Sequence, residues 1–176
     1  MKFLVSLVMF SLLLNGFAFA QTLLQDSCKK ATVIEPGLIY NFCVDSLTQD
    51  PQSKTATTLE GLILPSTKNA EAKAMNVKEI VEHILKGKKY ESIEAELRDC
   101  VEFYDDANDS LNTALASVRS HDYKTANENF SIALDVPGNC EDGIKERNKQ
   151  HSPVSNENND LFQKILIPLV FNYMLI

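Results

Sequence analysis

The clearest chemical groups in this 176-residue chain are four cysteines, Cys28, Cys43, Cys100 and Cys140. In an oxidising compartment, an even number of cysteines in a domain of this size usually forms disulfides. Four cysteines allow three pairings. We favour pairing in sequence order, Cys28 with Cys43 and Cys100 with Cys140, because it closes two local loops without threading one through the other. The sequence therefore predicts two structural disulfides.

The first twenty residues predict that the chain enters such a compartment. Lys2 precedes an apolar run over residues 3–14, and Ala18-Phe19-Ala20 has the small-x-small pattern that precedes signal peptidase cleavage. The run is shorter than the roughly 20 apolar residues that a membrane helix needs. We therefore expect residues 1–20 to be a secretory signal peptide and the mature chain, from Gln21, to be extracellular.

Catalytic and metal-binding motifs are missing from the sequence. The three histidines, His83, His121 and His151, form no H-E-x-x-H motif and do not lie at metal-ligand spacing from a cysteine. Nucleophile-elbow, P-loop and dinucleotide-binding motifs are also absent. Paired carboxylates such as Asp105-Asp106 are interpreted as parts of a solvated acidic surface. The sequence predicts a protein that is not an enzyme and that uses no metal, cofactor or small-molecule substrate.

The charge balance argues against two classes of partner. Cleavage of the signal peptide removes one of the 17 basic residues and none of the 24 acidic residues, which leaves a net charge of −8 with neutral histidines. Phosphate backbones and anionic membrane surfaces repel a chain this acidic. We therefore expect no nucleic-acid partner and no membrane partner.

Two sequons, Asn108-Asp109-Ser110 and Asn129-Phe130-Ser131, are potential glycan acceptors in a secreted protein. Both fall inside segments that are predicted to be helical, where acceptors are used less readily. Asn108 and Asn129 are therefore candidate glycosylation sites.

The elements that position these groups are predicted to be helices, because tryptophan is absent, glycine is scarce and β-branched residues do not cluster. The capping pattern Thr57-Thr58-Leu59-Glu60 predicts the start of a helix that runs to Leu85, with a kink or a late start at Pro65. The strongest apolar period in the chain follows one face of a second helix. Its members are Ile93, Leu97, Cys100, Tyr104, Ala107, Leu111, Leu115 and Val118.

Two more helices are predicted after this one. The first begins at Asp122, a good N-cap, and should end at Pro137-Gly138. The polar segment 146–159 is interpreted as a connection. An apolar helix with Pro168 in its interior then begins near Leu161.

Four helices with short links favour an all-α fold, an antiparallel four-helix bundle over residues 55–176. The preceding segment, residues 21–54, is predicted to be an appended helical hairpin. A removable lipid-anchor signal would also end in an apolar run. The bundle needs the last helix, however, so we favour a core helix there.

Several sequence blocks occur together along essentially the whole chain. They are Cys28-x14-Cys43, Asp50-Pro51-x-Ser53, Leu59-x-Gly61-Leu62, Asp99-Cys100 with Tyr104 and Ala107, and Ala133-Leu134-Asp135 followed by Cys140-Glu141-Asp142-Gly143. This combination resembles the plant invertase and pectin methylesterase inhibitor family, and especially its pollen allergens. The resemblance implies one inhibitor domain over residues 21–176, with the hairpin, the bundle and the two sequential disulfides. It also implies noncovalent inhibition of a cell-wall enzyme by a helical surface over its active-site cleft, in the plant apoplast.

The resemblance places a candidate partner-binding loop at His121 to Thr125. Family members that inhibit invertase carry Pro-Lys-Phe between the two disulfide-linked bundle helices, where this chain has Tyr123-Lys124-Thr125. Only Lys124 is retained. A start at Asp122 and Tyr123 is similar to the pectin methylesterase inhibitors, so the resemblance favours pectin methylesterase as the target. From the residues alone, Asp122 could simply cap its helix and Tyr123 could seal the end of the bundle.

Two other functions stay open at this point. One is inhibition of an acid invertase of the cell wall or the vacuole. The other is a secreted helical-bundle protein without inhibitory activity, acting as a binding module or known as a pollen allergen. A binding module of this kind could enclose a small apolar ligand between its helices. For the inhibitor we expect a monomer whose partner is a protein, a pectin methylesterase or an acid invertase. Pro65 and Pro168 depart from the family's continuous helices and could bend the binding face.

Overall fold

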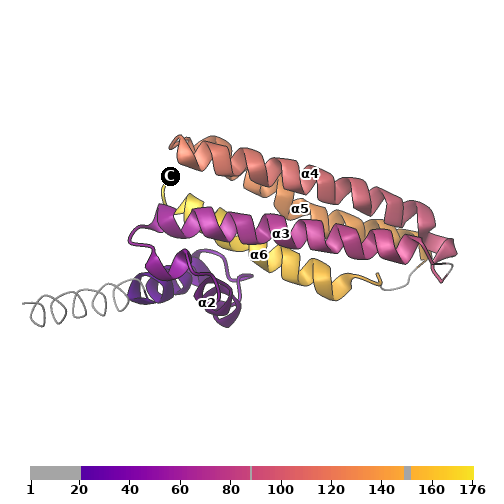
Figure 1. Ribbon diagram of the computed structural model, residues 1–176, viewed down its shortest axis with the longest axis horizontal. Helices are drawn as coiled ribbons and strands as arrows, with labels where there is room; N and C mark the ends of the chain where they lie inside the picture. The colour runs from indigo at the N-terminus through magenta and orange to yellow at the C-terminus, as the bar shows by residue number, and fades with distance from the viewer. Residues whose placement is uncertain (1–20, 88, 149–151) are drawn as a thin grey trace, which may run out of the picture.

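The computed structural model describes residues 21–87, 89–148 and 152–176, and these residues form helices and turns but no strand. Residues 21–34 are helical, and they are followed by α2 (Tyr40–Thr48), η1 (Ser53–Thr55), α3 (Leu59–Leu85), η2 (Glu91–Ile93), α4 (Glu94–Arg119), α5 (Tyr123–Asn148) and α6 (Ser155–Tyr173). Figure 1 shows α3 to α6 side by side, with α2 and the helix before it at one end of them. The predicted all-α fold, a helical hairpin followed by a four-helix bundle, is confirmed.

The four long helices pack in a ring in which each contacts the next and α6 contacts α3. The apolar face predicted for the second bundle helix points into this ring. Its buried members are Ile93, Leu97, Cys100, Tyr104, Ala107, Leu111, Leu115 and Val118. Phe130 of α5 and Phe171 of α6 are fully buried in the same core. Burial of one large apolar side chain contributes about 1.5–3 kcal/mol, so this core dominates the stability of the bundle.

The prediction that a helix ends at Pro137-Gly138 is wrong, because α5 continues through both residues to Asn148. A proline inside a helix removes one backbone hydrogen bond and costs about 3 kcal/mol. Residues beyond it offset this cost: Ile144 is fully buried, and Cys140 is bonded to Cys100 of α4. Tertiary packing and the disulfide therefore hold the helix together across the proline.

Pro65 does not delay the start of α3. The helix begins at Leu59, where the Thr58 hydroxyl accepts a 3.0 Å hydrogen bond from the Gly61 amide, and it runs without interruption through the buried Pro65. The predicted position of the start is confirmed. Glu60 does not complete a capping box, because the N-cap is Thr58 and the residue three positions after it is Gly61. The Glu60 carboxylate instead makes the contact with Tyr123 described below.

The interpretation of residues 146–159 as a connection is wrong at both ends, since α5 reaches Asn148 and α6 begins at Ser155. Asn158 explains the early start, because it is buried and its Oδ1 accepts a 2.7 Å hydrogen bond from the Tyr104 hydroxyl. Its Nδ2 donates to Glu141 Oε1 at 2.6 Å, and the Ser155 hydroxyl donates to Glu141 Oε2 at 2.7 Å. Burial raises the pKa of Tyr104, so the hydroxyl remains a donor. This network joins α4, α5 and α6 beside the second disulfide.

Gln163 of α6 is a buried side chain that helps to attach the hairpin to the bundle, beside the apolar residues Leu38 and Leu47, which belong to the same core. Gln163 of α6 accepts a 2.9 Å hydrogen bond from the Ile39 amide through Oε1, and its Nε2 donates to the Gly37 carbonyl at 2.8 Å. The Cys28–Cys43 disulfide joins the two helices of the hairpin on either side of this turn. The disulfide therefore holds the hairpin together, while Gln163 and the hydrogen bond from Lys164 Nζ to Ser46 Oγ at 3.3 Å join it to α6.

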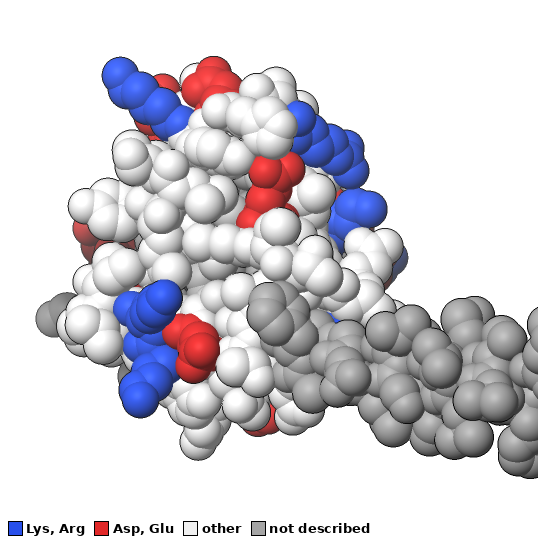
Figure 2. All heavy atoms as spheres, turned by 90° about the vertical axis from the view of Figure 1, so that its left-hand side faces the viewer, with Lys and Arg blue, Asp and Glu red and all other residues white. Residues whose placement is uncertain are grey.

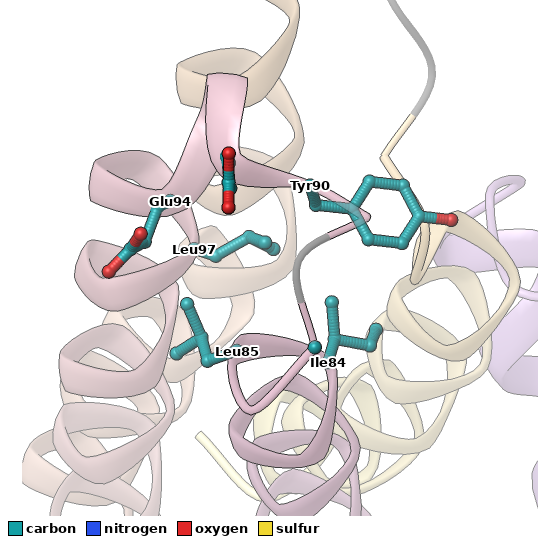
Figure 3. Close-up of a pocket in the computed structure, with 7 residues that line it drawn as sticks. Ile84, Leu85, Tyr90, Glu94 and Leu97 are labelled. Atoms are coloured by element: carbon teal, nitrogen blue, oxygen red, sulfur yellow. The ribbon is translucent and has the colours of Figure 1, made fainter.

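A hollow lies where α3 ends and α4 begins, and Figure 3 shows the side chains of Ile84, Leu85 and Leu97 converging there. Its volume is about 10 Å³, which is room for about one water molecule. This hollow is therefore too small for an organic ligand. Within the described ranges, no helix combines the length and hydropathy needed to cross a membrane.

Candidate partner-binding loop

The candidate loop lies at the end of the bundle where α4 turns into α5. α4 ends at Arg119 and α5 begins at Tyr123, so residues 120–122 make the connection and residues 123–125 form the first turn of α5. Figure 1 places this turn at the same end as the start of α3 and the C-terminus. Figure 2 views that end, where most visible side chains are uncharged, Lys and Arg side chains lie mainly toward the edge, and acidic side chains are also visible nearer the middle.

The backbone of the loop closes α4 with a Schellman motif. The Asp122 amide donates to the Ser117 carbonyl at 2.9 Å, and the His121 amide donates to the Val118 carbonyl at 3.0 Å. His121 has φ of 60°, the left-handed conformation in which glycine is the usual residue. A residue with a β-carbon pays at least about 1 kcal/mol for this conformation. Histidine at this position therefore makes the fold less stable than glycine would.

Replacing His121 with glycine is expected to raise the free energy of unfolding by roughly 0.5–1 kcal/mol, because glycine adopts this conformation without the β-carbon clash. Urea denaturation would measure the change. His121→Ala is the control, since it also removes the imidazole but keeps the β-carbon. If the glycine variant is no more stable than the alanine variant, the backbone conformation is not the source of the effect.

Asp122 caps α5 as predicted. Its Oδ1 accepts a 3.1 Å hydrogen bond from the Thr125 amide, and its carbonyl accepts one from the Ala126 amide at 3.0 Å. Hydrogen bonding by the Thr125 side chain and then by its amide lowers the pKa of Asp122. The ordinary value is about 3.9, so the contribution of the cap to stability is complete above that pH and is lost as the pH falls through the lower folded-state pKa. The loop therefore keeps its cap in mildly acidic solution.

Tyr123 is turned toward α3 and forms a cluster with two other side chains. Its hydroxyl donates to Glu60 Oε2 at 2.9 Å. His121 Nδ1 lies 2.9 Å from the same hydroxyl and 3.2 Å from Glu60 Oε2. The hydrogen bond to Glu60, and then burial, raise the pKa of Tyr123. Tyr123 also packs partly against the core, as expected for a residue that seals the end of the bundle.

Asn172 of α6 also holds the loop in place. This buried residue donates from Nδ2 to the Tyr123 carbonyl at 2.7 Å. The loop is thus bonded to α3 through Glu60 and to α6 through Asn172, in addition to its own two helices. Neither Glu60 nor Asn172 is among the predicted site residues. The only sequence signal at Glu60 is the capping pattern, which has a local explanation, and Asn172 shows no signal.

Lys124 is the basic side chain of the loop. It is exposed, and among the described residues no hydrogen bond or ion pair holds its ammonium group. Of the five predicted loop residues, the structure therefore commits Asp122, Tyr123 and Thr125 to internal contacts, His121 partly so, and leaves Lys124 available to a partner. Within the same described ranges, no three His, Cys, Asp or Glu side chains are grouped as a metal site.

The two candidate glycosylation sites lie on neighbouring helices. Asn108 is near the middle of α4, and Asn129 is in the second turn of α5. Both side chains are half-buried. Only Asn129 contacts the candidate loop, because its Nδ2 donates to the Thr125 carbonyl at 2.9 Å.

Comparisons with known proteins agree with the fold. The model of the plant invertase/pectin methylesterase inhibitor family matches residues 22–170. Pectinesterase inhibitor 12 of Arabidopsis thaliana is 63% identical over 175 residues, covering 99% of this chain and 100% of that protein. A Platanus orientalis protein named "Putative invertase inhibitor" is 38% identical over 159 residues, or 90% of this chain and 93% of that one. The crystal structure of mutant form A of an Arabidopsis pectin methylesterase inhibitor shares the fold, with a TM-score of 0.69 at 23% identity over 82% of this chain and 96% of that one.

Proposed function

Because the chain belongs to the plant invertase/pectin methylesterase inhibitor family, we propose that it is a secreted inhibitor of a pectin methylesterase. It blocks the active-site cleft of that enzyme without forming a covalent bond. The family and the relatives are inhibitors and not enzymes. The observation that carries the choice of target is the 63% identity to pectinesterase inhibitor 12 over nearly the whole of both chains.

The geometry of the loop supports inhibition by a preformed surface. The Schellman motif, the Asp122 cap and the contacts of Tyr123 with Glu60 and Asn172 hold the loop before any partner arrives. Binding then costs little ordering of loop and side chains, which would otherwise subtract from affinity. Lys124 supplies a free positive charge on this surface, and rim charges set the rate and specificity of association.

Titration of two enzymes tests the proposal. The mature protein, produced from Gln21 with both disulfides oxidised, is added to one pectin methylesterase and to one acid invertase. We expect the pectin methylesterase to lose its activity in proportion to added inhibitor and the invertase to keep its activity. Loss of invertase activity alone, or loss of neither activity at micromolar inhibitor, would contradict the proposal.

Acid invertase is the second candidate target. It is favoured by the name of the Platanus relative and by Lys124, which matches the lysine of the Pro-Lys-Phe tripeptide. The higher identity to the pectinesterase inhibitor and the Asp122-Tyr123 start weigh against it. The same titration decides between the two.

The proposal includes export to the plant cell wall. The predicted signal peptide, residues 1–20, lies outside the described residues. The two disulfides support an oxidising compartment, because disulfides persist there and are rare in the cytosol. We further propose that residues 21–176 act as one inhibitor domain and that the protein works as a monomer.

A further inference from the structure

The atom that would carry a glycan at Asn129 lies against the candidate loop. Asn129 Nδ2 is 2.9 Å from the carbonyl oxygen of Thr125, the last residue of that loop. Its side chain is half-buried and so reaches the surface. We propose that Asn129 is glycosylated during synthesis and that this glycan covers the loop and weakens inhibition. The inference rests on the function proposed above.

The second sequon provides a contrast. Asn108 lies eleven residues before the end of α4, which is about 16 Å along the helix axis. Asn129 lies six residues after the start of α5, or about 9 Å along its axis, and its side chain reaches back toward the loop. A bulky glycan at Asn108 would lie along the side of the bundle, whereas one at Asn129 begins beside the docking residues.

The folded helix does not present the Asn129 sequon to an enzyme. Phe130 is fully buried, and the Ser131 hydroxyl donates to the Asn127 carbonyl at 2.9 Å. Exposing Phe130 would cost about 1.5–3 kcal/mol, in addition to opening the helix. Glycan addition must therefore precede the folding of α5, and the glycosylated and unglycosylated forms do not interconvert afterwards.

The fold accommodates a glycan at this position. A substituted side-chain amide keeps one N–H, and that N–H can still donate to the Thr125 carbonyl. We therefore expect the contact between the second turn of α5 and the loop to be kept in the glycosylated protein. The glycan changes access to the loop and leaves its conformation intact.

Intact-mass measurement and enzyme titration test the inference. The full chain is secreted from a eukaryotic host as the parent and as Ser131→Ala, which destroys the sequon but keeps the Asn129 side chain. We expect the parent to carry a glycan mass that Ser131→Ala lacks, and Ser131→Ala to inhibit at least about tenfold more tightly, a change of 1.4 kcal/mol. Asn108→Gln is the matched control, and its inhibition constant should equal that of the parent.

Two results would overturn the inference. One is a mass difference between the parent and Ser131→Ala that is no larger than the substitution itself produces. The other is equal inhibition by the glycosylated parent and the same protein after enzymatic removal of its glycans. Protein made without glycans in a bacterial periplasm distinguishes failure of the proposed inhibitor function from failure of the inference about the Asn129 glycan. If it inhibits neither enzyme, the proposed function fails, whereas if it inhibits and Asn129 carries no glycan in the eukaryotic host, only this inference fails.

Discussion

Replacing Cys100 and Cys140 together with alanine is expected to lower the free energy of unfolding by about 4 kcal/mol. The disulfide closes a 40-residue loop that contains most of α4 and the first part of α5. In the unfolded chain this closure removes conformational freedom that the reduced chain would regain. Urea denaturation of the parent and the variant measures the difference. Because a domain of this size is stable by only about 5–15 kcal/mol, the variant should be close to the limit of folding at elevated temperature.

The other disulfide supplies a matched comparison. Cys28 and Cys43 close a 15-residue loop, and their replacement is expected to cost about 3 kcal/mol. The larger loss should thus accompany the larger loop. If the Cys100 and Cys140 variant loses less than the Cys28 and Cys43 variant, the unfolded-state account is wrong for this protein, and the network around Tyr104 already holds α4 to α5 without the bond.

The sequence was sufficient where a residue's role depends on its own helix. The apolar period from Ile93 to Val118 identified the buried face of α4, because a single helix that turns one face to a core repeats at spacings of three and four. The cap at Asp122 was predicted for the same kind of reason. Its side chain bonds only within the next turn of its own helix.

Predictions failed where a distant contact reversed a local preference. Pro137-Gly138 is a strong stop signal, yet α5 continues because Cys140 and Ile144 are held by the rest of the bundle. Asn158 marks a connection by its polarity, but its hydrogen bonds to Tyr104 and Glu141 place it in a helix. Local signals give no information about partners supplied by other helices.

For the candidate loop too, local features were predicted and distant contacts were missed. Its place between two predicted helices follows from the sequence, whereas its choice as a partner-binding loop came from the family resemblance. The hydrogen bonds that hold the loop could not be predicted from the sequence, because Glu60 and Asn172 are 63 and 49 residues away from Tyr123 in the chain. The capping pattern also gave Glu60 a local role, so the sequence offered no reason to look for a distant partner of its carboxylate. The available charge of Lys124 became distinguishable only once its neighbours were seen to be bonded to one another.

Replacing Lys124 with glutamate is expected to weaken inhibition of pectin methylesterase by at least about tenfold. The substitution reverses the positive charge of the loop without removing a hydrogen bond or ion pair inside the described part of the chain, and it loses only the weak attraction between Lys124 and the exposed Asp122 carboxylate. The free energy of unfolding should hardly change, since a carboxylate in the first turn of a helix is favourable. Inhibition constants and urea denaturation of both proteins would test the two parts of this expectation.

Lys145→Glu is the control, because Lys145 is also an exposed lysine of α5 but belongs to its last turn, at the other end of the bundle. It makes the same change in net charge, so any loss that comes from overall repulsion between the proteins would appear in both variants. A loss confined to Lys124→Glu would support docking through the loop, because a rim charge acts mainly on the partner groups that it faces. Equal losses in the two variants, or none in Lys124→Glu while the parent inhibits, would contradict docking through this loop and move the interface to another face of the bundle.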